Sequence, residues 1–151
     1  MTAVADIRDR LNAIMLAVLP AYVKLADSYE TSDNANPLFQ KGYSIGYSSA
    51  ENLTNEWCNL GQMRIRRQFQ IVMVNIYMPN MDADYREQLE DSLVDDQFAF
   101  ISAVEKDPTL TGMDVSSRYS FDNGVEYLID DSKQFIIVSM TITVDYFEET
   151  A

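Results

Sequence analysis

Residues 134–147 read QFIIVSMTITVDYF, and this stretch decides the fold. Apolar and polar side chains alternate along it, which is typical of a β-strand with one face on a core and the other in water or against another chain. The predicted core face holds Ile136, Val138, Met140, Ile142, Val144 and Tyr146, and the other face holds Ser139, Thr141, Thr143 and Asp145. A strand this long in a chain of 151 residues extends past its own core. We interpret the excess length as surface for assembly.

A second long strand is predicted over Arg64–Tyr77. Alternation places Phe69, Ile71, Met73 and Tyr77 on one face, and Val72, Val74 and Ile76 on the other. The middle of this strand is therefore apolar on both faces. Such a strand is either central in its sheet or covered on its second face by another subunit.

An acidic helix is predicted between the two strands, over Asp84–Val104. Asp84 and Glu87 form a start that resembles a capping box, and Pro108 follows its end. Its predicted core stripe is Tyr85, Leu89, Leu93, Phe100, Ile101 and Val104. Its outer face is predicted to be strongly negative, with Glu87, Glu90, Asp91, Asp95 and Asp96 as the acidic face.

The amino-terminal part of the chain is predicted to add a helix and a loop. Apolar residues recur at helical spacing from Asp6 to Leu19, and Pro20 marks the end or a kink of that helix. The stretch Asp27–Pro37 is polar and rich in turn-forming residues, so it is predicted to be a loop.

A short strand and a long loop are predicted next. Tyr43, Ile45 and Tyr47 alternate with small residues, which indicates a strand. The polar stretch Ser48–Gln62 is predicted to be a loop longer than usual. It carries Trp57, the only tryptophan, which either contacts a partner or folds back onto the core.

Two shorter strands are predicted around Asp114–Phe121 and Val125–Ile129. Asp122-Asn123-Gly124 lies between them and is a strong hairpin signal, because Asn-Gly tolerates the positive φ angles of a type I′ turn. The sequence therefore predicts one α+β domain over residues 1–151, in which two helices pack on a mainly antiparallel sheet of about five strands.

The composition limits the chemistry and the partners. The chain has 24 acidic and 11 basic residues, a net charge of −13, no histidine and one cysteine. Without histidine, Cys58 lacks the usual activating partner, and acidic pairs such as Asp95-Asp96 arise by chance in so acidic a chain. We expect no enzyme activity, no metal site and no cofactor. The negative field disfavours nucleic-acid wrapping, and it fits solubility, a basic partner or a surface that DNA passes without binding.

The chain shows no membrane-spanning run and no signal peptide, so we expect synthesis in the cytoplasm. The one basic cluster is Arg64, Arg66 and Arg67, and alternation places Arg67 on the opposite face from the other two. These arginines either pair with carboxylates of a neighbouring subunit or remain paired or solvated within their own sheet. The candidate subunit or partner interface is Trp57, Arg64, Arg66, Arg67, Val72, Val74 and Ile76.

The order of these segments resembles that of the tail-terminator (tail-completion) proteins of long-tailed bacteriophages. The resemblance includes the first helix, the apolar long strand, the acidic helix opening YREQLED at residues 85–91, the Asp-Asn-Gly hairpin, and the final strand ending VDYFE at residues 144–148. It implies a virion protein, made in the host cytoplasm, that forms a hexameric ring on the last ring of tail-tube protein. Such a ring stops tube growth, offers a docking surface to the head connector or neck protein, and lets DNA through its channel without specific binding.

Two other functions remain open from the sequence. The chain is also compatible with another head–tail joining component, such as a neck or adaptor protein, since these share its size and mixed topology. An acidic inhibitor that mimics DNA is the alternative from a different class. An enzyme ranks below both, for the reasons given above.

Overall fold

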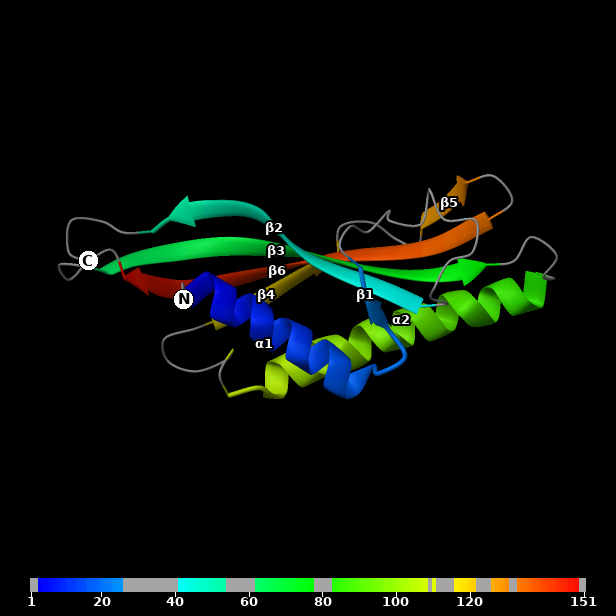
Figure 1. Ribbon diagram of the computed structural model, residues 1–151, viewed down its shortest axis with the longest axis horizontal. Coiled ribbons are helices and arrows are strands. Elements are labelled where there is room, and N and C mark those ends of the chain that lie inside the picture. The colour runs from blue at the N-terminus through cyan, green and yellow to red at the C-terminus, as the bar shows by residue number, and fades with distance from the viewer. Residues whose placement is uncertain are drawn as a thin grey trace.

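The computed structural model describes residues 3–25, 41–53, 62–77, 83–108, 110, 116–121, 126–130 and 133–149. The elements are α1 (Ala3–Val18), β1 (Val23–Lys24), β2 (Lys41–Asn52), β3 (Gln62–Tyr77), α2 (Ala83–Lys106), β4 (Ser116–Phe121), β5 (Glu126–Asp130) and β6 (Lys133–Glu149). The strands form one six-stranded sheet, and both helices lie on the same face of it (Figure 1). The predicted α+β class is confirmed, with six strands where about five were expected.

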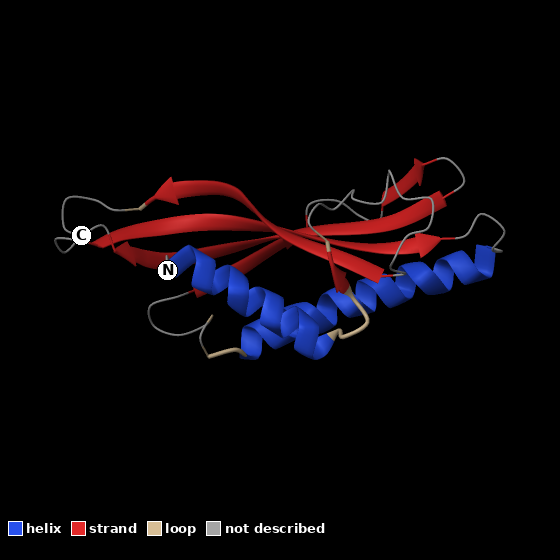
Figure 2. Cartoon of the chain, in the orientation of Figure 1, coloured by secondary structure: helices blue, strands red, loops and turns tan. Residues whose placement is uncertain are grey.

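A long two-stranded ribbon runs through the centre of the sheet. β3 and β6 contain 16 and 17 residues, and they pair antiparallel along their whole length, from Gln62 opposite Glu149 to Tyr77 opposite Gln134. At about 3.4 Å per residue the ribbon spans about 50 Å, whereas a 16-residue helix such as α1 spans only about 24 Å. One end of the sheet therefore extends past the start of α1, and the whole sheet is twisted (Figure 2).

The face of the ribbon under the helices carries the main core. All six residues predicted for the core face of the last strand are buried there, as are Phe69, Ile71 and Met73 of β3. Leu11 and Met15 of α1 pack into the same cluster. Leu93, Phe100 and Val104 of α2 complete it. The alternation in the sequence thus identified the core face correctly.

A second, smaller apolar cluster lies on the opposite face of the ribbon. It consists of Val72, Val74, Phe135 and Ile137, with Ile76 packed against it. Val74 and Phe135 are each only 1% exposed in the single chain. Of the two alternatives for a strand that is apolar on both faces, the central-strand interpretation is therefore correct for Val72 and Val74, since no second subunit is needed to bury them.

The predicted hairpin at Asp122-Asn123-Gly124 is wrong. β4 and β5 do not pair with each other: each pairs antiparallel with β6, β4 with residues 140–145 and β5 with residues 133–137. They run in the same direction along the edge of β6 that β3 does not occupy. The hairpin is formed instead by β5 and β6, which are consecutive in the chain and pair from Asp130 opposite Lys133. Long-range pairing along β6 outweighed the local turn signal, and residues 122–125 lie outside the described residues.

The predicted loop Ser48–Gln62 begins too early, because β2 continues to Asn52. The register with β3 shifts between Tyr47 and Ala50, where three steps along β2 match two along β3. This β-bulge changes the side-chain alternation, so that Glu51 lies opposite Arg66 on the face away from the helices. Trp57 lies outside the described residues.

The two predicted helices are confirmed, with small shifts at their ends. α2 buries Leu93, Gln97, Phe100, Ile101 and Val104 against the sheet. Tyr85, predicted in the core stripe, is 41% exposed because the first turns of α2 extend to the end of the molecule, beyond the part of the sheet that they could cover. The two-residue strand β1, which pairs parallel with β2, was not predicted.

We predict that Ile142→Asp destabilises the fold by about 4 kcal/mol, because Ile142 is fully buried and its pocket offers no partner for a charge. The measurement is urea denaturation followed by circular dichroism. The matched control is Thr143→Asp, on the opposite face of β6, with an expected loss of about 1 kcal/mol or less. Equal stability of the two variants would contradict this assignment of the faces.

Candidate functional site

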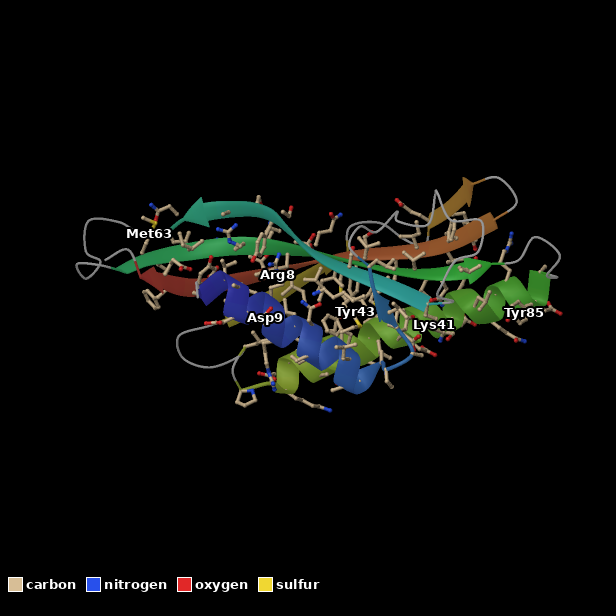
Figure 3. The ribbon with its side chains drawn as sticks, in the orientation of Figure 1. Arg8, Asp9, Lys41, Tyr43, Met63 and Tyr85 are labelled. Carbon is tan, nitrogen blue, oxygen red and sulfur yellow. The ribbon has the colours of Figure 1, made fainter. Side chains whose placement is uncertain are left out.

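The exposed carboxylates of α2 gather towards one end of the molecule. Asp84, Glu87, Asp91 and Asp95 are exposed, while Glu90 is half-buried and lies 4.0 Å from Arg86. In Figure 3 Tyr85 lies near one end of the long axis and Met63 near the other, so the start of α2 is far from the start of β3. Of the five residues predicted for the acidic face, Glu87, Asp91 and Asp95 are exposed as predicted.

Asp96 departs from the predicted acidic face. It lies one turn after Leu93, beside the buried stripe, and accepts a 2.8 Å hydrogen bond from the Tyr22 hydroxyl. The Lys41 ammonium lies 3.5 Å from the same carboxylate and 5.6 Å from the centroid of the Tyr22 ring. Burial, and then the hydrogen bond to Asp96, raise the pKa of Tyr22 far above its ordinary value. Asp96 therefore joins α2 to β2 and to the segment before β1, which is a structural role.

Arg66 forms the best-defined ion pair of the sheet. Its Nε and Nη2 donate to Asp145 Oδ1 and Oδ2 at 2.9 and 3.1 Å, across directly paired positions of β3 and β6. The Asp145 side chain is 7% exposed, and its hydrogen bonds raise the pKa of Arg66. For Arg66 the intrachain alternative is therefore correct. Arg64 is exposed on the same face of β3, near the projecting end of the sheet.

Arg67 lies on the helix face, as predicted, and belongs to a cluster that the sequence analysis missed. We define the Tyr47 corner as Arg8, Tyr47 and Arg67. The guanidinium carbons of Arg8 and Arg67 lie 4.4 and 5.3 Å from the centroid of the Tyr47 ring. Arg67 Nε also donates to the Tyr146 hydroxyl at 3.1 Å. This corner joins α1, β2 and β3, so no single local pattern could have revealed it.

Exposed aromatic side chains lie at the opposite edge of the sheet. Phe98 of α2 and Phe121 of β4 are 53% and 51% exposed, and their ring centroids are 5.5 Å apart. Closer to the start of α2, the Arg86 guanidinium lies 5.8 Å from the ring centroid of Tyr127 in β5. α2 thus flanks the β4–β5 edge, whereas the Tyr47 corner lies at the β2 edge. Exposed aromatic residues are common anchors of protein interfaces.

The described part of the chain offers no cluster of three His, Cys, Asp or Glu side chains that could hold a metal ion. In the same part, no helix is long and apolar enough to cross a membrane. The sequence matches no protein-family model and no curated protein. The function is therefore inferred from the residues and geometry of the chain itself.

We predict that Tyr22→Phe lowers the free energy of unfolding by about 2 kcal/mol, because it removes a hydrogen bond to a charged, partly buried carboxylate. The measurement is chemical denaturation at neutral pH. Tyr127→Phe, at an exposed position of β5, is the control and should leave stability unchanged. Loss of the same size in both variants would show that the Tyr22–Asp96 bond contributes nothing specific.

We also predict that Arg66→Met lowers the urea midpoint, because it leaves the buried Asp145 carboxylate without its bidentate partner. The double variant Arg66→Met/Asp145→Leu should recover most of the loss, since two apolar side chains replace the pair. Arg64→Met, at an exposed position two residues away, is the comparison and should have the smaller effect. A double variant less stable than Arg66→Met would contradict this account.

Proposed function

We propose that this chain is a structural virion protein that forms a ring at the head-proximal end of a phage tail tube. The ring ends polymerisation of the tube and provides the docking surface for the head connector. The observation that carries the proposal is the β3–β6 ribbon, which extends past the helix layer at the centre of a sheet whose two edges, β2 on one side and β4 and β5 on the other, could pair with neighbours. The resemblance of segment order to tail-terminator proteins supplies the biological context.

The two edges of the sheet support assembly by side-by-side contact. β1 pairs only with Gly42 and Tyr43, so from Ser44 to Asn52 the outer edge of β2 meets no other described strand. The outer edges of β4 and β5 likewise meet no described strand. Unpaired strand edges are templates for pairing with another chain unless the protein covers them. A ring in which each subunit covers one edge of the next removes that exposure.

The charge distribution supports a head-to-tail ring over a contact between identical patches. Four exposed carboxylates lie between residues 84 and 95 of α2, the helix that contacts β4 and β5, and the Tyr47 corner brings two guanidinium groups to the β2 edge. Contact of an acidic patch with its own copy would be repulsive, whereas contact of opposite edges is attractive. A head-to-tail contact generates a closed ring when its rotation closes. A net charge of −13 also suits a channel that DNA crosses without binding.

Among the alternatives, a DNA-mimicking inhibitor fits the described surface less well. Such a protein needs carboxylates spaced like phosphates along an extended face. On the face of the sheet away from the helices, the middle instead carries uncharged polar side chains, among them Ser44, Gln70 and Thr141. The remaining alternative is another neck or adaptor ring. Such a ring would use the same ribbon and sheet edges, but it would bind the head connector without binding tail tubes.

We predict that the purified chain forms particles of six times the 17.2 kDa subunit mass, seen as rings by negative-stain microscopy and checked by light scattering. Added to polymerising tail-tube protein, it should shorten the tubes and appear at one end of each tube. Binding to the head connector without binding to tubes would favour the neck or adaptor alternative. A protein that stays monomeric and leaves tube growth unchanged would refute the ring.

A further inference from the structure

We infer that the Tyr47 corner of one subunit binds the exposed carboxylates Glu87 and Asp91 on α2 of a second copy of this chain. The inference rests on the proposed ring and names the contact that would hold neighbouring subunits together. It is carried by two arginines that lack a carboxylate partner among the described residues of a strongly acidic protein. It is also carried by the geometry that holds them in place.

Arg8 and Arg67 differ from the other arginines whose contacts the structure describes. Arg10 pairs with Asp107, Arg66 with Asp145 and Arg86 with Glu90. Among the described residues, neither Arg8 nor Arg67 has a carboxylate within ion-pair distance. With 24 acidic residues against 11 basic ones, carboxylates are abundant in this chain. Two guanidinium groups on one tyrosine ring, neither paired with a described carboxylate, are therefore a site that an external anion can fill.

The corner is also organised before any partner arrives. A guanidinium group that stacks on an aromatic ring is held there by cation–π attraction while its N–H donors remain directed outward in its own plane. The Tyr146 hydroxyl further orients Arg67, and Phe69 contacts the Tyr47 ring edge-on at 5.6 Å between centroids. The Tyr47 ring is 41% exposed, so the site is open to solvent. The two oxygens of a carboxylate match the guanidinium fork, as do two oxygens of a phosphate.

The spacing of the α2 carboxylates fits two guanidinium groups. Both guanidinium carbons lie within 5.3 Å of one ring centroid. Glu87 and Asp91 are both exposed and four residues apart on α2, so their Cβ atoms are about 6 Å apart on one side of the helix. One helix can therefore present a carboxylate to each arginine.

The donor of these carboxylates must be another copy, because Arg8 and the start of α2, marked by Tyr85, lie far apart along the long axis of the subunit (Figure 3). α2 contacts β4 and β5 through Phe98 and Arg86, whereas Tyr47 lies on β2, beyond β3 and β6. A DNA phosphate has related chemistry, but the net charge of −13 opposes its approach. Complementary charges on opposite edges favour a second copy of the chain as the occupant.

The first experiment compares Arg8→Glu with Lys24→Glu, an exposed control with the same change in net charge. Assembly is followed by mass photometry over a concentration series, and unchanged thermal melting confirms the fold of each variant. Arg8→Glu should raise the concentration needed for half-assembly by roughly tenfold, as expected for the loss of a charged interface pair. Lys24→Glu should have little effect. Equal behaviour of the two variants would overturn the inference.

The second experiment is a charge exchange. Glu87→Lys/Asp91→Lys should weaken assembly, and the same two changes combined with Arg8→Glu/Arg67→Glu in one chain should restore it, because the pairs re-form with reversed sign. Arg67→Gln replaces Arg67→Glu if the latter lowers the melting temperature, since Arg67 also contacts the buried Tyr146. The contact would be overturned if the combined variant assembled no better than the weaker of Glu87→Lys/Asp91→Lys and Arg8→Glu/Arg67→Glu.

Two further results separate the possible failures. If the wild-type chain forms no ring alone or on tail tubes, the proposed function itself fails, and the contact with it. If the wild-type chain forms rings but the Tyr47 corner variants form them equally well, only this inference fails. Binding of a short fluorescent DNA duplex that is lost in Arg8→Glu, with assembly unchanged, would overturn the inference and assign the corner to phosphate.

Discussion

The full-length pairing of β3 with β6 is the constraint on which the rest of the structure depends. Because side chains alternate between faces, a slip of one residue would move every core residue of a strand to the opposite face. Apolar clusters on both faces of the ribbon prevent such a slip: Ile71 and Ile142 lie under the helices, and Val74 and Ile137 pack on the reverse. The bidentate Arg66–Asp145 pair adds a polar match in the same register near the projecting end.

That ribbon also determines what the molecule can offer to neighbours. Both helices cover one face, and part of the other face buries the second apolar cluster, so the described strands leave their two lateral edges for contacts outside the chain (Figure 1). The edges differ in chemistry: α2 brings carboxylates and the Phe98–Phe121 pair to one, and β2 brings the Tyr47 corner to the other. An elongated subunit with two unlike edges suits directional assembly better than a symmetric dimer through one patch.

Long-range contacts overrode local signals at two places. Asn-Gly at residues 123–124 has a strong local turn preference, yet β4 pairs with residues 140–145 of β6 rather than with β5, which pairs with the start of β6. Asp96 was placed on the outer face of α2 by helical position, but the Tyr22 hydroxyl and Lys41 approach it from distant parts of the chain. Local propensity is a weak guide where long-range contacts compete with it.

The sequence by itself determined the α+β class, the two long strands, the faces of β3 and β6, and the two helices. It could do so because alternation and helical spacing are local consequences of which side chains must leave water. Only the tertiary structure decided the strand order, the bulge after Tyr47, the inward position of Asp96 and the placement of Arg8 and Arg67 on the Tyr47 ring. These depend on contacts between residues far apart in the chain, and their geometry exists only once the sheet has formed.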